Sequence, residues 1–186
     1  MPSRAEIYLL RLWNILTGIT GDSGKGAALI APVGGIGVTS HGITITQIPT
    51  ITAGAYIAGD AVGGLLTFAN AARIAGGGGV IKDMLIVDDA GQDAVLELWL
   101  FDRTFTAIAD NAAWAPSEAD LENLITVITT ADIDYLAAGT PSAIPVEVAK
   151  RYDCVGVDLF GQLVTRGTPT YVATDDLTVK ILLLQD

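Results

Sequence analysis

The sequence has few of the residues that usually carry catalysis or crosslinks. Among its 186 residues are one cysteine, one histidine and only 6% aromatic residues. A lone Cys154 cannot form an internal disulfide, so we expect a fold that depends on its core and interfaces, as in a reducing cytosol. A lone His41 excludes a zinc site built on a pair of histidines. We interpret Cys154 as a packed apolar residue and His41 as a solvated or interface residue.

Charge is also scarce, and most of it has one sign. Charged residues make up 17% of the chain, and 21 acidic residues against 10 basic ones give a net charge of -11. Such a chain repels phosphate groups and anionic lipid surfaces, so we expect neither nucleic acid nor a membrane as a partner. Hydrophobic residues nevertheless reach 51%. We interpret this surplus as surface that the protein buries against other chains.

The long apolar stretches do not predict a membrane span. A spanning helix needs about 20 apolar residues, whereas residues 7–19 are too few and include Arg11 and Asn14. The charge-free residues 26–59 contain two prolines and seven glycines, which break a helix. Because no small-residue cleavage pattern follows the first apolar stretch, we also expect no secretory signal.

The first region, residues 1–52, predicts a helix followed by an extended arm. Ser3 and Glu6 match a capping box, and Gly18 matches a helix stop. The apolar side chains between them share one face at helical spacing: Leu9, Leu12, Trp13 and Leu16. A short helix of this kind is marginal alone in water. We therefore expect it to dock on the body of its own chain or on a neighbouring subunit.

The arm carries a strand pattern near its end. Residues 42–48 alternate apolar and hydroxyl side chains, which is typical of a half-buried strand, and Pro49 ends it. An unpaired strand of this kind invites aggregation, which pairing with another subunit's sheet would prevent. Helix and arm together supply the candidate interaction residues, namely Leu9, Leu12, Trp13, Leu16, Ile43, Ile45 and Ile48.

Residues 53–186 predict a mainly β body, an antiparallel β-sandwich with one short inserted helix. Strand patterns are clearest at residues 80–87, 94–101 and 177–184, and the turn-forming residues 88–93 predict a hairpin between the first two. The helix is expected after Ser117, which can cap it. Because residues 125–130 are rich in β-branched side chains, a strand is the alternative for the end of this helix.

Motifs for cofactors, metals or catalysis are weak or absent. Residues 21–26 lack the first glycine and the hydroxyl residue of a phosphate loop. The glycine run 76–79 predicts a flexible turn, since it does not follow a strand as a dinucleotide motif would. The acidic residues within 88–93, and Asp132 with Asp134, lack the order of a calcium loop. We therefore expect no enzyme activity, no cofactor and no metal.

Several segments of the body resemble the head decoration (cement) proteins of tailed bacteriophages. The likeness covers residues 54–186 and is carried by 55–64 (AYIAGDAVGG), 97–101 (ELWLF), 110–111 (DN), 116–120 (PSEAD), 163–171 (LVTRGTPTY) and the closing strand. The resemblance implies a jelly-roll-like sandwich, often a homotrimer, that is made in the host cytoplasm. On the virion surface such a protein binds the phage major capsid protein and ties its neighbouring subunits together.

Two other functions fit the same composition. A tail or baseplate component of a phage would differ only in its position in the virion. A carbohydrate-binding sandwich would present an exposed aromatic platform, for which Trp99 and Trp114 are the candidates. For the decoration protein, we expect that deletion of residues 1–52 spares the folded body and weakens attachment to the head.

Overall fold

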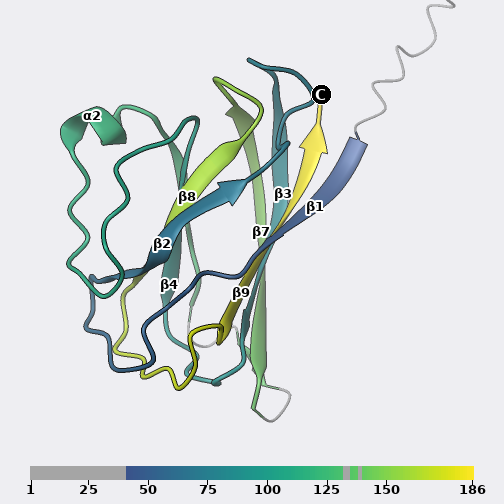
Figure 1. Ribbon diagram of the computed structural model, residues 1–186. Coiled ribbons are helices and arrows are strands. Elements are labelled where there is room, and N and C mark those ends of the chain that lie inside the picture. The colour runs from purple at the N-terminus through teal and green to yellow at the C-terminus, as the bar shows by residue number, and fades with distance from the viewer. Residues whose placement is uncertain (1–40, 132–134, 138–139) are drawn as a thin grey trace, which may run out of the picture. The chain divides into compact units, whose positions relative to one another are not determined.

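The computed structural model describes residues 41–131, 135–137 and 140–186. The chain divides into two units, Met1–Gly37 and Val38–Asp186, and every described residue belongs to the second. The described residues of that unit form β-strands and one short helix (Figure 1). The predicted N-terminal helix lies outside the described residues, and with it Leu9, Leu12, Trp13 and Leu16.

Five strands form the first sheet, in the order β1-β9-β3-β7-β6 with antiparallel neighbours. Their bounds are β1 (His41–Gln47), β3 (Gly78–Asp88), β6 (Leu136–Ala137), β7 (Ser142–Asp153) and β9 (Leu177–Gln185). The second sheet has four antiparallel strands in the order β2-β8-β4-β5. Their bounds are β2 (Ala61–Phe68), β4 (Leu96–Phe101), β5 (Leu124–Thr129) and β8 (Leu159–Thr165), and helix α2 (Glu118–Leu121) precedes β5.

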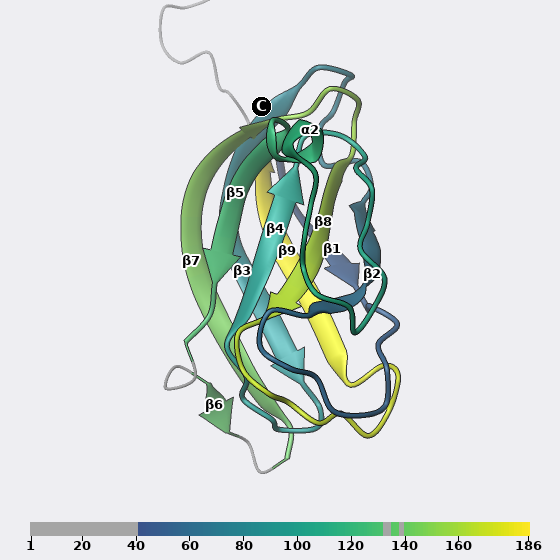
Figure 2. The ribbon, with the colours of Figure 1, turned by 90° about the vertical axis from the view of Figure 1, so that its left-hand side faces the viewer.

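The two sheets form two layers, so that in Figure 2 one sheet lies in front of the other. Buried side chains from both sheets form one hydrophobic core between them. In β9 every second side chain, from Leu177 to Leu183, is completely buried, whereas the residues between them are partly exposed. Leu96, Leu98 and Leu100 of β4 supply buried side chains from the opposite sheet. Alternation of this kind follows from the period of two in a strand. The prediction of a mainly β antiparallel sandwich is therefore confirmed.

The predicted hairpin between residues 80–87 and 94–101 is wrong. These strands are β3, which pairs with β7 and β9, and β4, which pairs with β5 and β8 in the other sheet. The buried Asp88 carboxylate accepts hydrogen bonds from the backbone N–H groups of Ala90, Gln92 and Asp93, and these fix the turn. Turn residues therefore predicted where the chain bends but not which sheet it enters next.

The strand predicted in the arm belongs to the body of its own chain. β1 pairs with β9 from His41 opposite Gln185 to Gln47 opposite Val179. Ile43 and Ile45 pack against the core. The arm therefore does not extend to residue 52 as expected, and this strand completes the sheet of its own chain. Pairing with β9 satisfies one edge of β1 without a second subunit, and the other edge of β1 is an edge of the sheet.

Three further expectations are settled by the structure. Gly78 and Gly79 are not a flexible turn but the start of β3, where an added Cβ atom would lie 2.2 and 2.1 Å from carbonyl oxygens of β7 and β9. The Ser117 cap is confirmed, because its hydroxyl accepts a hydrogen bond from the Asp120 N–H. The helix ends at Leu121, and the β-branched residues after it form β5, which confirms the strand alternative.

Candidate interaction surfaces

The outer face of the four-stranded sheet is covered by the chain's own connection between β4 and α2. Phe105 of this connection stacks on Phe101 of β4 with ring centroids 4.1 Å apart, and it meets Trp114 edge-on at 6.4 Å. Trp114 in turn contacts Trp99 of β4 at 5.3 Å. Aromatic pairs at such distances attract beyond the area that they bury. The cluster therefore holds the connection against the sheet.

Gln162 of β8 anchors the same connection from the side of the sheet. Its side chain is completely buried. Its amide donates hydrogen bonds to the carbonyl oxygens of Gly63 at 2.7 Å and Ile108 at 2.6 Å, and its carbonyl accepts one from the Ile108 N–H at 3.0 Å. A buried amide must find such partners, because an unpaired one costs about 1–3 kcal/mol. Gln162 is thus a structural clamp.

Trp99 and Trp114 do not form an exposed platform. Both are only partly exposed and are occupied with each other. The Trp99 indole N–H donates to Glu97 at 2.9 Å, and Arg166 donates to the same carboxylate oxygen at 2.7 Å. The guanidinium of Arg166 and the indole lower the pKa of Glu97, against the opposing effect of burial. This arrangement gives no support to a sugar-binding site at the tryptophans.

Three of the segments that carry the resemblance to decoration proteins, residues 55–64, 110–111 and 163–171, are joined by hydrogen bonds. Asp110 accepts hydrogen bonds from the Tyr56 hydroxyl at 2.7 Å and from the Gly63 N–H. Further backbone bonds join residues 54–59 to residues 165–171. Burial and the nearby Asp110 carboxylate raise the pKa of Tyr56, so its hydroxyl stays protonated and continues to donate. These residues stabilise loops and leave no reactive group aimed at a ligand.

The outer face of the five-stranded sheet is not covered by any described residue. Leu182 and Leu184 of β9 and Leu85 of β3 lie there between polar side chains, all partly exposed. A shallow depression of about 270 Å³ lies over β1, β3, β7 and β9 and is lined by Leu85, Pro145 and Leu182 among others. An antiparallel sheet facing water normally carries polar residues on that side. This partly apolar face is therefore the best candidate for an interaction surface.

Charges on this face are grouped unevenly. Lys82 binds Asp83 at 3.4 Å and Glu147 at 3.0 Å, so two carboxylates share one ammonium group. Lys180 lies on the same face, in the lining of the depression, and forms no ion pair with a described residue. One side of the face thus has an excess negative charge and another an excess positive charge.

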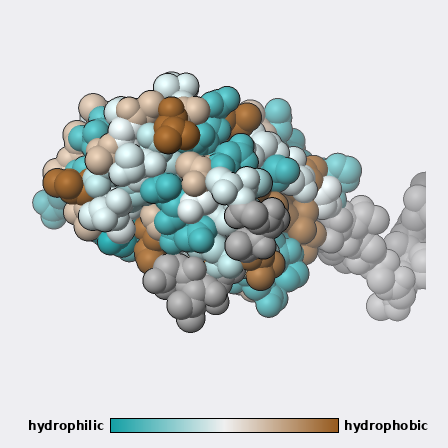
Figure 3. Space-filling view, turned by 90° about the horizontal axis from the view of Figure 1, so that it is seen from below, coloured by the Kyte–Doolittle hydropathy of each residue, from teal (hydrophilic) through white to brown (hydrophobic). Residues whose placement is uncertain are grey.

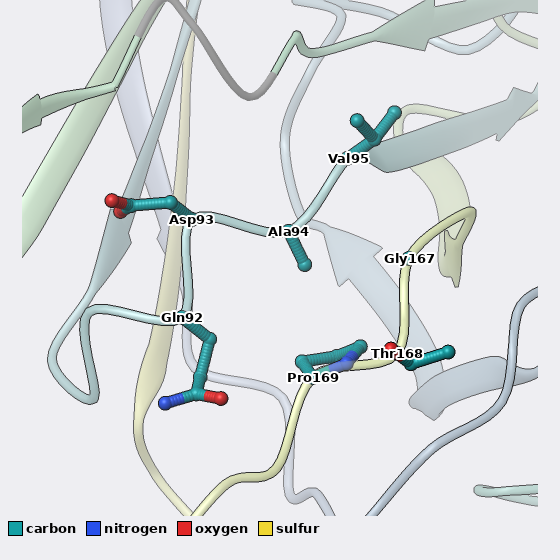
Figure 4. A pocket seen from close by; sticks show the side chains of 7 residues that line it. All are labelled: Gln92, Asp93, Ala94, Val95, Gly167, Thr168 and Pro169. Atoms are coloured by element: carbon teal, nitrogen blue, oxygen red, sulfur yellow. The ribbon is translucent and has the colours of Figure 1, made fainter.

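A second hollow lies between loops at the end of the sandwich where β3 ends and β9 begins (Figure 4). It has a volume of about 240 Å³ and is lined by residues 92–95 and 167–169. Two of its polar side chains already have partners: Gln92 accepts a hydrogen bond from the Thr170 N–H at 2.9 Å, and Asp93 accepts one from Ser142. We interpret this hollow as a gap between packed loops and not as a binding site.

The surface viewed from below the orientation of Figure 1 presents hydrophobic side chains as separate groups among hydrophilic ones (Figure 3). Scattered apolar residues of this kind are normal on a protein surface, whereas a large continuous patch would mark a binding site. This view therefore offers no candidate comparable with the outer sheet face.

The candidate catalytic and metal-binding residues are not assembled into a site in the described part of the chain. Cys154 is 4% exposed, and burial raises the pKa of its thiol to about 11, so it is not a reactive thiolate. His41 is exposed at the start of β1. The described residues contain no group of three or more possible metal-binding side chains. Asp132 and Asp134 lie outside the described residues.

Of the predicted interaction residues that the structure describes, only Ile48 is available to a partner, with 60% of its surface exposed. Ile43 and Ile45 point into the core instead. Leu182 and Leu184 of the outer face were missed. The available signal was that β9 becomes apolar on both sides towards its end, which indicates a covered outer face.

Comparisons with protein-family models, curated proteins and solved structures found no match. Among the described residues, no helix has the length and apolar character needed to cross a membrane.

Proposed function

We propose that this protein is a structural component of a tailed-phage virion, a decoration (cement) protein that bridges major capsid protein subunits on the head. It acts as a homo-oligomer, with a trimer as the expected form. It needs no cofactor and catalyses no reaction. In this role the protein is a scaffold that holds other proteins together, as the resemblance to decoration proteins implies.

The strand order is the observation that supports this proposal best. Without the two-residue β6, the remaining strands numbered along the chain have the orders 1-8-3-6 and 2-7-4-5 in the two sheets. Consecutive strands then change sheet at every step except between β4 and β5. Two four-stranded sheets connected as Greek keys are the jelly roll, a fold common in viral capsid proteins. We propose this finer assignment for the sandwich.

Surface composition supports the same function. The chain is 51% hydrophobic with a mean hydropathy of +0.49, and one sheet face remains partly apolar. Several copies on one head multiply modest contacts through avidity, so each contact need not be strong. A body without an assembled catalytic group in its described residues suits such a role.

Binding to purified phage particles tests the proposal. The full chain is mixed with heads assembled without it and, separately, with tails, and bound protein is measured by co-sedimentation. We expect saturable binding to heads and a higher temperature of head disruption. Binding to tails alone would instead support a tail or baseplate component. A glycan array that binds the protein would support the carbohydrate alternative.

The oligomeric state is tested separately by light scattering of the purified protein. A trimer has three times the chain mass of 19.3 kDa. A mass of one chain at all accessible concentrations would contradict the homo-oligomer but not head binding.

A further inference from the structure

The outer face of the five-stranded sheet has a pattern that can pair with itself. Cross-strand register places the face in rows: Leu184 lies opposite Val80, and Leu182 opposite Asp83. In the next row Lys180 lies opposite Leu85. Paired residues in an antiparallel sheet share one face. The outer face therefore presents rows of aliphatic side chains that are interrupted by a few charged side chains. We refer to these rows as the grid.

Two charged residues of this face, Lys180 and Glu147, lie on opposite sides of its central strand, which itself carries Lys82 and Asp83. Lys180 is on β9, Glu147 is on β7, and β3 runs between these strands. Glu147 is opposite Asp83, one row away from Lys180. Because Asp83 and Glu147 share only Lys82, a negative charge remains there, and Lys180 supplies an unpaired positive charge among the described residues.

We propose that this face binds the same face of a second copy of the chain through a two-fold axis. An axis lying in the contact plane that exchanges Lys180 with Glu147 passes close to Leu182, Leu184 and Pro145, by the register of the sheet. Each of these apolar residues then meets its own counterpart, and so does Asp83, which lies on β3 between Leu182 and Glu147. Lys82, 3.4 Å from Asp83, compensates the charge of this carboxylate. Each Lys180 faces the partner's carboxylates, so the contact is self-complementary, as a two-fold interface requires.

Local charge favours a second copy over another acidic surface. The whole chain carries a net charge of -11, and two such chains repel each other over most orientations. On this face Lys82, Lys180 and Arg151 balance Asp83, Glu147 and Asp153, so two copies approach without net repulsion. The excess charges also select one register, because like charges placed opposite each other are costly.

The size of the face is sufficient for a specific contact. Strands lie about 4.8 Å apart and rise about 3.3 Å per residue, so β1, β9, β3 and β7 form a face of roughly 20 by 25 Å. Two copies then cover about 1,000 Å² of flat sheet, the size at which specific interfaces begin. In a trimeric protein such a two-fold contact is additional to the three-fold contacts and joins two trimers.

A charge exchange between separate proteins tests the inference. Lys180→Glu alone and Glu147→Lys alone each place like charges opposite each other in the two-fold contact. We expect each variant to have half the particle mass of the original protein by light scattering, with self-association weakened at least tenfold. In an equimolar mixture of the two variants the charges are complementary again, and the original mass should return.

The apolar part of the proposed contact is tested by a matched pair of variants, Leu182→Asp and Val172→Asp. Both replace an aliphatic side chain by the same charge, but Val172 is a loop residue with 78% of its surface exposed and lies away from the sheet face. Leu182→Asp should halve the particle mass and Val172→Asp should leave it unchanged. Circular dichroism confirms that each variant remains folded.

Results of three kinds would overturn the inference: a single-chain mass for the original protein, an unchanged mass in both charge variants, or no recovery in the mixture. The inference rests on the self-association part of the proposed function and not on the capsid partner. Head binding measured with the same variants therefore separates the two. If Lys180→Glu keeps its mass and still binds heads, this contact is wrong while the decoration function stands.

Discussion

At the scale of single residues, buried polar side chains in this protein hold loops in place. Asp88 accepts three backbone hydrogen bonds, and Gln162 joins β8 to two other segments. Asp110 binds Tyr56 and Gly63 in the same way. The turn at Asp88 was predicted from its turn-forming neighbours, whereas the roles of Gln162 and Asp110 were not, because their partners lie about 50 to 100 residues away along the chain. These hydrogen bonds fix the loops of the body to its strands.

The ion pair between Glu97 and Arg166 predicts a stability that depends on pH. Arg166 lowers the pKa of Glu97 in the folded protein, so the pair stabilises the fold above the unfolded pKa of about 4.3. That stabilisation is lost as the pH falls through the lower folded pKa. We expect Glu97→Gln to lower the free energy of unfolding by about 1–2 kcal/mol at pH 7, and the difference to shrink from pH 5 to pH 2.

Glu147→Gln provides the control for this measurement by urea denaturation. Its carboxylate also forms an ion pair, but 76% of its side chain is exposed, and exposed pairs contribute little. An equal loss for both variants, or a Glu97→Gln effect independent of pH, would contradict the assignment.

At the scale of elements, β1 shows how pairing changes the interpretation of a segment. Its alternating pattern correctly predicted a strand, but its partner could not be inferred, because β9 lies more than a hundred residues further along the chain. The position of β1 also changes where the chain can be truncated without removing part of the folded body. Residues 41–52 contain β1 and the buried Ile51, so deletion of residues 1–52 removes part of the body.

Two truncated proteins measure the contribution of β1. Deletion of residues 1–52 removes Ile43, Ile45 and Ile51 from the core, whereas deletion of residues 1–40 retains all three. Because each buried aliphatic side chain contributes about 1.5–3 kcal/mol, we expect the longer deletion to be less stable by at least about 3 kcal/mol. Denaturant unfolding compares the two. Equal unfolding midpoints would show that β1 is dispensable.

The connection over the four-stranded sheet makes a second prediction at this scale. Phe105 is 7% exposed and contacts Phe101 and Trp114. Phe105→Ala leaves a cavity and should lower the free energy of unfolding by about 3 kcal/mol. Thr106→Ala, at the exposed neighbouring position, should change it by less than about 0.5 kcal/mol. Tryptophan fluorescence follows both, and the emission of the Phe105→Ala protein should shift to longer wavelength as Trp114 loses its cover.

At the scale of the whole molecule, local patterns predicted more of the fold than of the surfaces. Period-two alternation identified the sandwich and its closing strand, because burial on one side leaves a direct mark on the sequence. The order of strands in the sheets could not be predicted from such local patterns. Gly78 and Gly79 were wrongly predicted to form a flexible turn, because their tight packing depends on neighbouring strands that are distant in the sequence. The outer sheet face was missed for the same reason, since its residues come from strands far apart in the sequence.

The central position of β9 has a consequence for how a newly made chain reaches this state. Of the strands, β9 leaves the ribosome last, yet it lies between β1 and β3 in the sheet. Until it inserts, β1 has no neighbour in that sheet, and the grid containing Leu182 and Leu184 does not exist. Folding is therefore dominated by distant pairings and should be slow. Nascent chains on one messenger RNA cannot associate through this face before their sheets are complete.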